Sequence, residues 1–298
     1  MKTVESEFIN QSFNSKADYL REDKRFYREI SLVADEIALS AKRKPVVLLS
    51  GPSGSGKTTT AHMLQDMLLK SGHRAHVISL DNYFKTVLPG EDDKVDFEAP
   101  SRINAELLSE HIKLISECKE IELPTFDFLT KESRTSGKIF KRRKGEVVIF
   151  EGIHALNPDV AVFDESKTVK LYASVRTRVL YGEKIFHPKY LRLLRRMSRD
   201  ALYRGRSVSE TLSFYKSVER GEELYVAPFK RLADFSIDTF IAYEPMIYKT
   251  NLLSRLDGIS EKASDVPEML ADFLKRFKDG SNDCVVKDSI IREFIGKF

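Results

Sequence analysis

The chain has 298 residues, of which 42% are apolar and 32% are charged, proportions typical of a folded globular protein and not of a disordered one. No apolar run approaches the roughly 20 residues needed to span a bilayer, and acidic side chains stand where a signal peptide has its apolar core, so we expect a cytoplasmic protein without a membrane segment. The net charge of +4 suits a small anionic substrate without requiring nucleic acid, and two cysteines are too few for a disulfide framework or a zinc site.

The N-terminal region predicts one helix ahead of the first buried strand. Phe26, Ile30, Val33 and Ile37 recur at helical spacing, with charged residues between them. This spacing indicates an amphipathic helix over residues 24–41, which packs on the core and leaves its charges in solvent.

The stretch from Pro45 to Thr60 carries the most specific motif of the chain. An apolar run at 46–49 predicts a buried strand, and a helical pattern of apolar residues begins at Ala61. Between them, residues 51–58 match the phosphate-binding pattern G-x-x-x-x-G-K-[ST]. The glycines let the backbone bend so that consecutive N–H groups can point at phosphate oxygens.

This loop is expected to hold a nucleoside triphosphate. The following helix adds partial positive charge at the same place, Lys57 can reach the outer phosphates, and the Thr58 hydroxyl can ligate Mg2+. A glycine-rich linker of the same composition is the alternative, which the flanking strand and helix disfavour. The loop residues expected to bind the triphosphate are Gly51, Ser53, Gly54, Ser55, Gly56, Lys57, Thr58 and Thr59.

A second strand, at 76–80, delivers Asp81 to the sheet edge where open parallel sheets bind ligands. An acidic residue at this edge can accept the proton of a substrate hydroxyl, and a helix-capping aspartate is an equally weighted alternative. The polar stretch 85–104, which contains Asp96 and Glu98, predicts a solvated loop.

A β-hairpin insertion is expected to stand off the main sheet. Residues 121–128 face residues 138–140 across a turn that contains the Ser-Gly pair at 136–137. Phe126 and Phe128 share one face of this hairpin, where they either stack on a ring or form the core of the hairpin.

Three further apolar runs complete the expected sheet. Residues 147–150, 167–175 and 235–241 alternate with helical patterns, which predicts an α/β fold with a doubly wound parallel sheet of about five strands. Glu151 follows the first of these runs, where a P-loop enzyme places an acidic group near Mg2+.

The most charged helix is expected over residues 190–206. Four of its arginines fall on one helical face, and two more flank Gly205 at its end. Guanidinium groups suit phosphate because their planar fork binds two oxygens, whereas an ordinary basic helix or RNA binding is the alternative. The arginines of the face are Arg192, Arg195, Arg196 and Arg199, and those at the end are Arg204 and Arg206.

The chain divides into three expected parts. Residues 1–44 form a helical extension, 45–242 form the P-loop core, and 243–298 form a helical cap with helical patterns at 266–277 and 288–294. No internal repeat or low-complexity tract interrupts this order.

Taken together, the motifs resemble the uridine kinase and phosphoribulokinase family. GPSGSGKTT, SLDNYF, DFEAP, PTFDF, VVIFEGIHAL, RRMSRDALYRGR and PFKRLADF occur in that family's order between Pro45 and Ala242. The ending DSIIREFIG, from Asp288 to Gly296, also resembles a bacterial subgroup of nucleoside kinases. The resemblance implies a P-loop kinase that uses ATP and Mg2+, with an arginine-rich lid helix over the triphosphate.

By position, the resemblance implies roles for individual residues. Asp81 would take the proton from a sugar 5′-hydroxyl, and Glu98 would hold the ribose hydroxyls. Thr58 and Glu151 would hold Mg2+. The implied catalytic residues are Asp81, Lys57, Arg199 and Arg204, and the implied lid arginines are Arg196, Arg199, Arg204 and Arg206. The implied contacts to the acceptor are Asp81, Tyr83, Phe84, Glu98, Phe126, Phe128, Lys131 and Arg199.

Two positions depart from the animal members of the family. Lys131 lies near the place of a histidine, and Phe214 aligns with a glutamine that contacts the pyrimidine. We therefore expect an ATP-dependent nucleoside kinase with uridine or cytidine as first candidates, and ATP against GTP stays open. The alternatives are a kinase of another small alcohol, such as a sugar phosphate or a vitamin, and an RNA-binding regulator.

A nucleotide-operated switch is a further alternative. The N-K-x-D and D-x-x-G motifs of GTP-binding switches are absent from the chain, which disfavours it. The expected partner is a small nucleoside-like molecule, and a homo-oligomer is compatible with the sequence.

Overall fold

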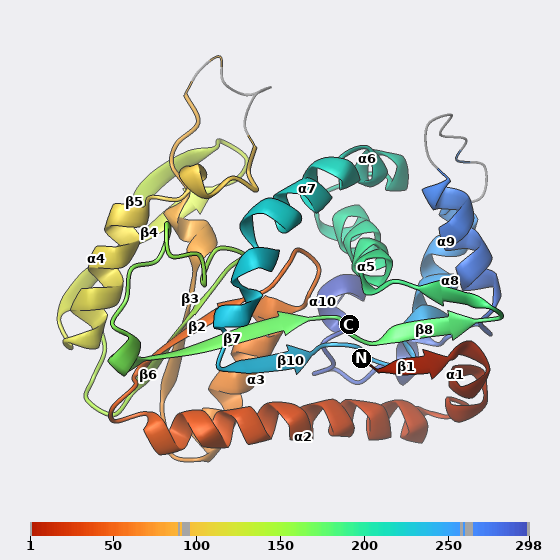
Figure 1. Cartoon of the computed structure of the whole chain (residues 1–298), viewed down its shortest axis with the longest axis horizontal. Helices are drawn as coiled ribbons and strands as arrows, with labels where there is room; N and C mark the ends of the chain where they lie inside the picture. Colours follow the sequence, from red (N-terminus) through yellow and green to blue (C-terminus); the bar gives the residue numbers. More distant parts are fainter. Residues whose placement is uncertain (1, 89, 91–95, 257–258, 260–264, 297–298) are drawn as a thin grey trace.

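The centre of the fold is a parallel sheet. The computed structural model describes residues 2–88, 90, 96–256, 259 and 265–296 (Figure 1). The strand order of the five-stranded sheet is β10-β7-β2-β6-β3, and every neighbouring pair is parallel. The strands are β10 (Phe235–Asp238), β7 (Thr168–Ser174), β2 (Val46–Ser50), β6 (Val147–Glu151) and β3 (Ala75–Ser79). The predicted doubly wound α/β fold is confirmed.

Side chains of the central strand β2 alternate between two cores. Val47 and Leu49 pack on one face of the sheet with α2 (Lys16–Ser40) and α3 (Lys57–Lys70). The intervening residues of β2 pack on the other face with α4 (Ala105–Ser116). Because helices cover both faces, the whole strand is buried and reads as a continuous apolar run.

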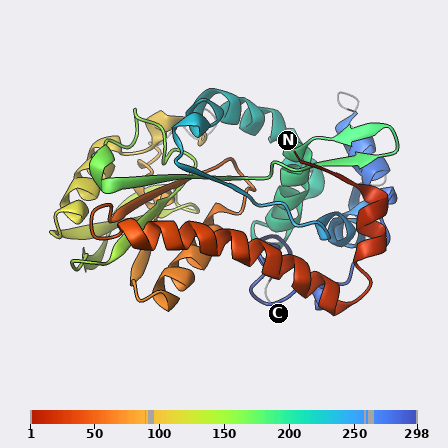
Figure 2. The same ribbon diagram turned by 60° about the horizontal axis from the view of Figure 1, so that its bottom comes forward.

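Helix α2 begins earlier than the sequence prediction of residue 24. The Asp18 carboxylate accepts hydrogen bonds from the Ser15 N–H at 2.9 Å and from the Ser15 hydroxyl at 2.8 Å. This pairing is the carboxylate half of a capping box, which stabilises a helix start at Lys16. Figures 1 and 2 show α2 running along the length of the molecule on one side of the sheet.

A small second sheet was not predicted from the sequence. Strand β1 (Thr3–Glu5) pairs in parallel with β8 (Arg178–Tyr181), which pairs in antiparallel with β9 (Lys184–Phe186). The short helix α1 (Ser6–Ser12) joins β1 to the segment ahead of α2. Strands of three or four residues are too short to be recognised from the alternation of apolar and polar residues.

The predicted hairpin is present, but its turn lies elsewhere. Strands β4 (Glu120–Asp127) and β5 (Glu132–Lys141) pair in antiparallel, and the turn covers residues 128–131. The Asp127 carboxylate accepts from the Leu129 N–H at 2.8 Å and closes this turn. The Ser-Gly pair that was expected at the turn lies inside β5, opposite an irregularity between Glu122 and Pro124.

The second half of the chain is mostly helical. The expected arginine-rich helix runs from Pro188 to Tyr203, and Gly205, with a φ of 61°, follows its end. Of the expected helix 288–294, only its last residues form a helix. The helices are α5 (Pro188–Tyr203), α6 (Val208–Ser213), α7 (Tyr215–Tyr225), α8 (Glu244–Leu256), α9 (Val266–Lys275) and α10 (Arg292–Ile295).

The described residues contain no helix with the length and apolar character that crossing a membrane requires. Within the polar stretch 85–104 that was expected to be a solvated loop, residues 89 and 91–95 lie outside the described residues. The remainder of that stretch includes a 3-10 turn, η3 (Pro100–Arg102).

Candidate active site

The phosphate-binding loop lies between the end of β2 and the start of α3. Gly51 has no room for a side chain, because a Cβ at that position would lie 2.0 Å from the Ala173 carbonyl oxygen. Gly56 has a φ of 81° and precedes α3 in the left-handed region. The N–H of Thr60 bonds to the Gly56 carbonyl at 2.9 Å, so the N–H groups ahead of it have no partner inside the helix. The loop is therefore built to receive an anion.

Arginines of α5 hold the tip of this loop. The Arg192 guanidinium donates to the Ser53 carbonyl oxygen at 3.1 Å, and that of Arg196 donates to the Ser53 hydroxyl at 2.8 Å. Arg195 donates to the Gly54 carbonyl oxygen at 3.2 Å. Three of the four arginines on the predicted face therefore contact the loop.

One arginine of that face, Arg195, serves the structure, which the sequence pattern did not predict. Arg195 is fully buried and donates to both carboxylate oxygens of the equally buried Glu244, at 2.8 and 2.9 Å. It also donates to the Thr239 carbonyl oxygen at 2.6 Å. A buried guanidinium paired in this way joins α5 to the start of α8 and is not free to move with a ligand.

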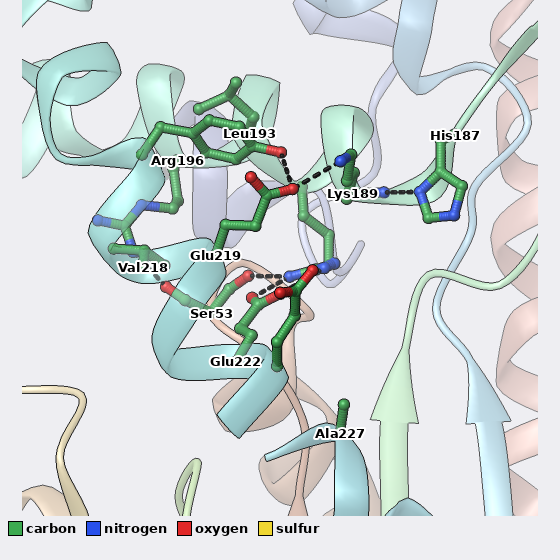
Figure 3. Close-up of a pocket in the computed structure, with 12 residues that line it drawn as sticks. Ser53, His187, Lys189, Leu193, Arg196, Val218, Glu219, Glu222 and Ala227 are labelled. Carbon is green, nitrogen blue, oxygen red and sulfur yellow. Dashed lines mark hydrogen bonds and ion pairs between the residues drawn. The ribbon is translucent and has the colours of Figure 1, made fainter. Parts of the chain in front are cut away.

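A cavity of about 180 Å³ lies between α5 and α7, against Ser53. Figure 3 shows two carboxylates of α7 pointing at cations of α5. The Lys189 ammonium donates to Glu219 at 2.6 Å, and the Arg192 guanidinium donates to Glu222 at 2.7 Å. The cavity therefore lies beside the phosphate loop, on the lid side, and two ion pairs join α5 to α7 in its wall.

Asp81 lies directly after β3, in the 3-10 turn η1 (Leu80–Tyr83), and its side chain is accessible to solvent although protein crowds around it. Desolvation raises the pKa of its carboxyl, and the opposing charges of Lys57, Arg204 and Arg199 only partly offset this rise. A carboxylate with an elevated pKa beside several cations is suited to accepting a proton.

Thr58 and Glu151 meet at the sheet edge between the loop and β6. The Thr58 hydroxyl donates to the buried Glu151 carboxylate at 3.3 Å. Burial and the nearby Asp81 charge raise the pKa of Glu151, and Lys57 lowers it. Among the described residues, no group of three or more His, Cys, Asp or Glu side chains is arranged to hold a metal. Two protein oxygens fit Mg2+, which takes few protein ligands and completes its shell with phosphate and water.

Four phenylalanines form a cluster between the end of β3 and the hairpin. Phe126 and Phe128 lie edge to face with ring centroids 4.9 Å apart, and the Phe84 ring lies 5.4 and 5.8 Å from them. The Phe97 ring lies 5.8 Å from that of Phe84. Phe126 is buried, whereas Phe128 is 54% exposed. Each of the two alternatives stated for these phenylalanines therefore applies to one of them. Phe126 forms core, whereas Phe128 offers a ring face or edge to a ligand.

Tyr83 does not face the site. It is 1% exposed, and its hydroxyl bonds to Nδ1 of His111 on α4 at 3.0 Å. The expectation that Tyr83 contacts the acceptor is therefore wrong, because the 3-10 turn after β3 directs this ring into the core.

Glu98 and the lid arginines lie around the same region. One carboxylate oxygen of Glu98 is 4.0 Å from the Arg196 guanidinium, and burial raises the pKa of this carboxyl. Arg199 and Arg204 both pair with the buried Asp200, at 3.0 and 3.5 Å. Asp200 thus orients the two arginines whose charges lower the pKa of the Asp81 carboxyl.

The last two expected contacts lie at the periphery. The Arg206 guanidinium lies over the Phe214 ring, 5.3 Å from its centroid. Lys131 has a φ of 57° in the hairpin turn, and its carbonyl oxygen accepts from the Val87 N–H at 3.0 Å. This bond holds the hairpin turn against the segment that follows η1.

Sequence reasoning missed His154 and Glu293. His154 is buried beside the backbone of Glu98 and Tyr225, and desolvation lowers its pKa to about 4, so the imidazole is neutral near pH 7. The sequence feature that could have pointed to His154 is its position three residues after Glu151. Glu293 bonds to Thr59 of the phosphate loop from the C-terminal helix, across a sequence separation that no local pattern bridges.

The loop, the arginine helix aimed at it and the acidic groups at the ends of β3 and β6 define a P-loop phosphotransferase. Residues 46–242 match the phosphoribulokinase / uridine kinase family, to which the chain belongs. The family implies ATP-dependent phosphoryl transfer.

The chain is similar to two curated uridine kinases and to a solved kinase structure. A uridine kinase of Ligilactobacillus salivarius is 31% identical over 201 residues, which cover 66% of this chain and 86% of the relative. A uridine kinase of Lactobacillus johnsonii is 28% identical over 205 residues, which cover 67% of this chain and 88% of the relative. A solved D-glycerate 3-kinase from Cryptococcus neoformans is 18% identical with a TM-score of 0.35, covering 89% of this chain and 88% of that one.

Proposed function

We propose that this protein is an ATP-dependent nucleoside kinase that transfers the γ-phosphoryl group to the 5′-hydroxyl of a nucleoside. The observation that carries the proposal is the placement of Asp81 at the end of β3 beside Lys57, Arg199 and Arg204. A base and three cations at one edge of the sheet suit in-line transfer from the bound triphosphate. Uridine and cytidine are the first candidates, because the relatives above carry the name uridine kinase.

The chemistry rests on positioning and charge. Asp81 hydrogen-bonds the attacking hydroxyl, orients it in line with the γ-phosphorus and takes its proton. Lys57, Arg199 and Arg204 stabilise the negative charge that develops on the equatorial oxygens. Mg2+, which the oxygens of Thr58 and Glu151 would hold, supplies further charge neutralisation on the phosphates.

The acceptor binds between the hairpin and the segment around Glu98. Phe128 presents an exposed ring on which a base can stack, and Phe126 supports it from the core. Glu98 lies 4.0 Å from Arg196 and provides carboxylate oxygens for ribose hydroxyls. The ion pair between Glu98 and Arg196 thus joins the acceptor side to the lid.

A second candidate is the same transfer to another small alcohol, such as a sugar phosphate. Lys131 lies in the same hairpin turn as the exposed Phe128, and a cationic residue in this turn favours an anionic alcohol as acceptor.

The test is ADP release measured by a coupled assay, with each common nucleoside and with several sugar alcohols and sugar phosphates. We expect turnover that depends on a pyrimidine nucleoside. Asp81→Asn keeps the shape and loses the proton acceptor, so turnover should fall by roughly 10²–10⁴ while ATP affinity stays within a few-fold.

The matched control is Asp159→Asn, because Asp159 is an exposed aspartate after β6 whose backbone N–H bonds to Asn157. This variant should keep wild-type turnover. Turnover with sugar phosphates alone would favour the second candidate. Full nucleoside-dependent turnover in Asp81→Asn would show that the base lies elsewhere.

A further inference from the structure

The segment 288–296 lies beyond the part of the chain that matches the family, yet it contacts the phosphate-binding loop. The Ile290 side chain lies so close to Gly56 that a Cβ on this glycine would be 2.4 Å from Ile290 Cδ1. Three residues later, the Glu293 carboxylate accepts a hydrogen bond from the Thr59 hydroxyl at 2.6 Å and one from the Thr59 N–H at 3.3 Å. The C-terminal segment is therefore one wall of the loop.

The segment is anchored to residues that lie outside the phosphate loop. The Tyr27 hydroxyl donates to the Asp288 carbonyl oxygen at 2.5 Å, and the hydroxyls of Tyr243 and Ser289 bond at 2.9 Å. The Phe294 ring is fully buried under the Arg195 guanidinium, 4.9 Å from its centroid. These contacts hold the segment in place, whereas Glu293 is only partly buried and reaches the loop with a flexible side chain.

Thr59 lies at a position that favours the binding of an anion. It is the third residue of α3, so its N–H is one of the helix-start donors without a partner in the helix. The partial positive charge of the helix start lies at the same place. A phosphate bound in the loop would accept hydrogen bonds from these donors at the helix start. The Glu293 carboxylate takes the place of such a phosphate, because it accepts hydrogen bonds from the N–H and the hydroxyl of Thr59.

We propose that Glu293 is a built-in competitor of the donor nucleotide, whose carboxylate must leave Thr59 before a phosphate of the nucleotide can bind there. The inference depends on one part of the proposed function, namely that ATP binds at the phosphate loop. Two anions cannot share one pair of donors, so each nucleotide that binds must displace the carboxylate and lose part of its affinity. Glu293 thereby sets the affinity for the donor.

The test is calorimetric titration of Mg-ATP into the full chain without an acceptor. Glu293→Gln keeps the size of the side chain and removes its charge, so the dissociation constant of ATP should fall about tenfold, the effect of removing one charge-assisted hydrogen bond. The matched control is Glu36→Gln, an exposed glutamate on the outer face of α2, which should leave the constant unchanged.

A double-mutant cycle ties the effect to Thr59. Thr59→Val keeps the shape and removes the hydroxyl that makes the 2.6 Å bond. In this background, Glu293→Gln should tighten ATP binding less than about threefold. A tenfold gain that persists without the hydroxyl would mean a diffuse charge effect and would overturn the inference, as would unchanged or weaker binding in Glu293→Gln alone.

The outcomes separate this inference from the assignment of the nucleotide site. If Lys57→Ala binds ATP as well as the wild type does, ATP does not use the loop and the proposed function itself fails. If ATP binding depends on Lys57 but does not respond to Glu293→Gln, only the competitor role fails. Thermal melting without nucleotide should show one cooperative transition in both proteins, with Glu293→Gln melting slightly lower because it loses the charged contact to Thr59, so that a gain in affinity cannot reflect a loss of folding.

Discussion

Asp23 carries a pH dependence of stability that can be worked out from the structure. It lies on α2, is 1% exposed, and accepts a hydrogen bond from the Tyr243 hydroxyl at 2.8 Å. Tyr243 in turn bonds to Ser289 of the C-terminal segment. Burial raises the pKa of the Asp23 carboxyl from 3.8 to about 6, although these hydroxyls lower it.

The magnitude and sign of the effect follow from this difference in pKa. The folded protein binds the Asp23 proton more tightly than the unfolded chain does, so the stability this proton contributes is complete below pH 3.8 and is lost as the pH rises through about 6. About two pKa units, at about 1.4 kcal/mol per unit, correspond to about 3 kcal/mol of unfolding free energy. Asp23→Asn resembles the protonated side chain at every pH and should not lose this stability.

The assay is urea unfolding at a series of pH values from 4 to 8. The unfolding free energy of Asp23→Asn should match that of the wild type near pH 4 and exceed it by up to about 3 kcal/mol at pH 8. Asp35→Asn, an exposed position on the same helix, should follow the wild-type curve. Parallel curves for wild type and Asp23→Asn would refute the reasoning, because the carboxyl would then titrate alike in the folded and unfolded states.

Two further predictions concern α5. Arg199→Ala and Arg204→Ala should each lower kcat by roughly 10²–10³, with a smaller change in the KM for the nucleoside. The reason is that these two cations, which Asp200 orients, act on the negative charge that develops during phosphoryl transfer. Small and equal changes in kcat and KM would instead indicate that the arginines form a solvated face. Glu244→Gln should lower the free energy of urea unfolding by about 3–5 kcal/mol, because it leaves the Arg195 guanidinium buried without a counter-charge. A loss below 1 kcal/mol would show that water reaches this pair.

Local patterns predicted the centre of the fold and the loop. The run at residues 46–49 is apolar at every position because helices cover both faces of the sheet and bury every side chain of this strand, so the strand can be predicted from the sequence. The glycines of the phosphate loop are recognisable in the sequence because Gly54 and Gly56 have φ angles of 72° and 81°, a local conformation that few other residues adopt. The sequence alone therefore determined the sheet, the loop and the family resemblance.

Tertiary structure alone decided which of several like residues meets which partner. Arg195 and Arg196 are neighbours in sequence, yet one is buried against Glu244 and the other reaches Ser53, because a helix turns them by about 100°. Tyr83 stands two residues after Asp81 but points into the core at His111. Glu293 meets Thr59 across 234 residues, and no periodicity encodes such a contact, because it depends on how the C-terminal segment packs on the finished core.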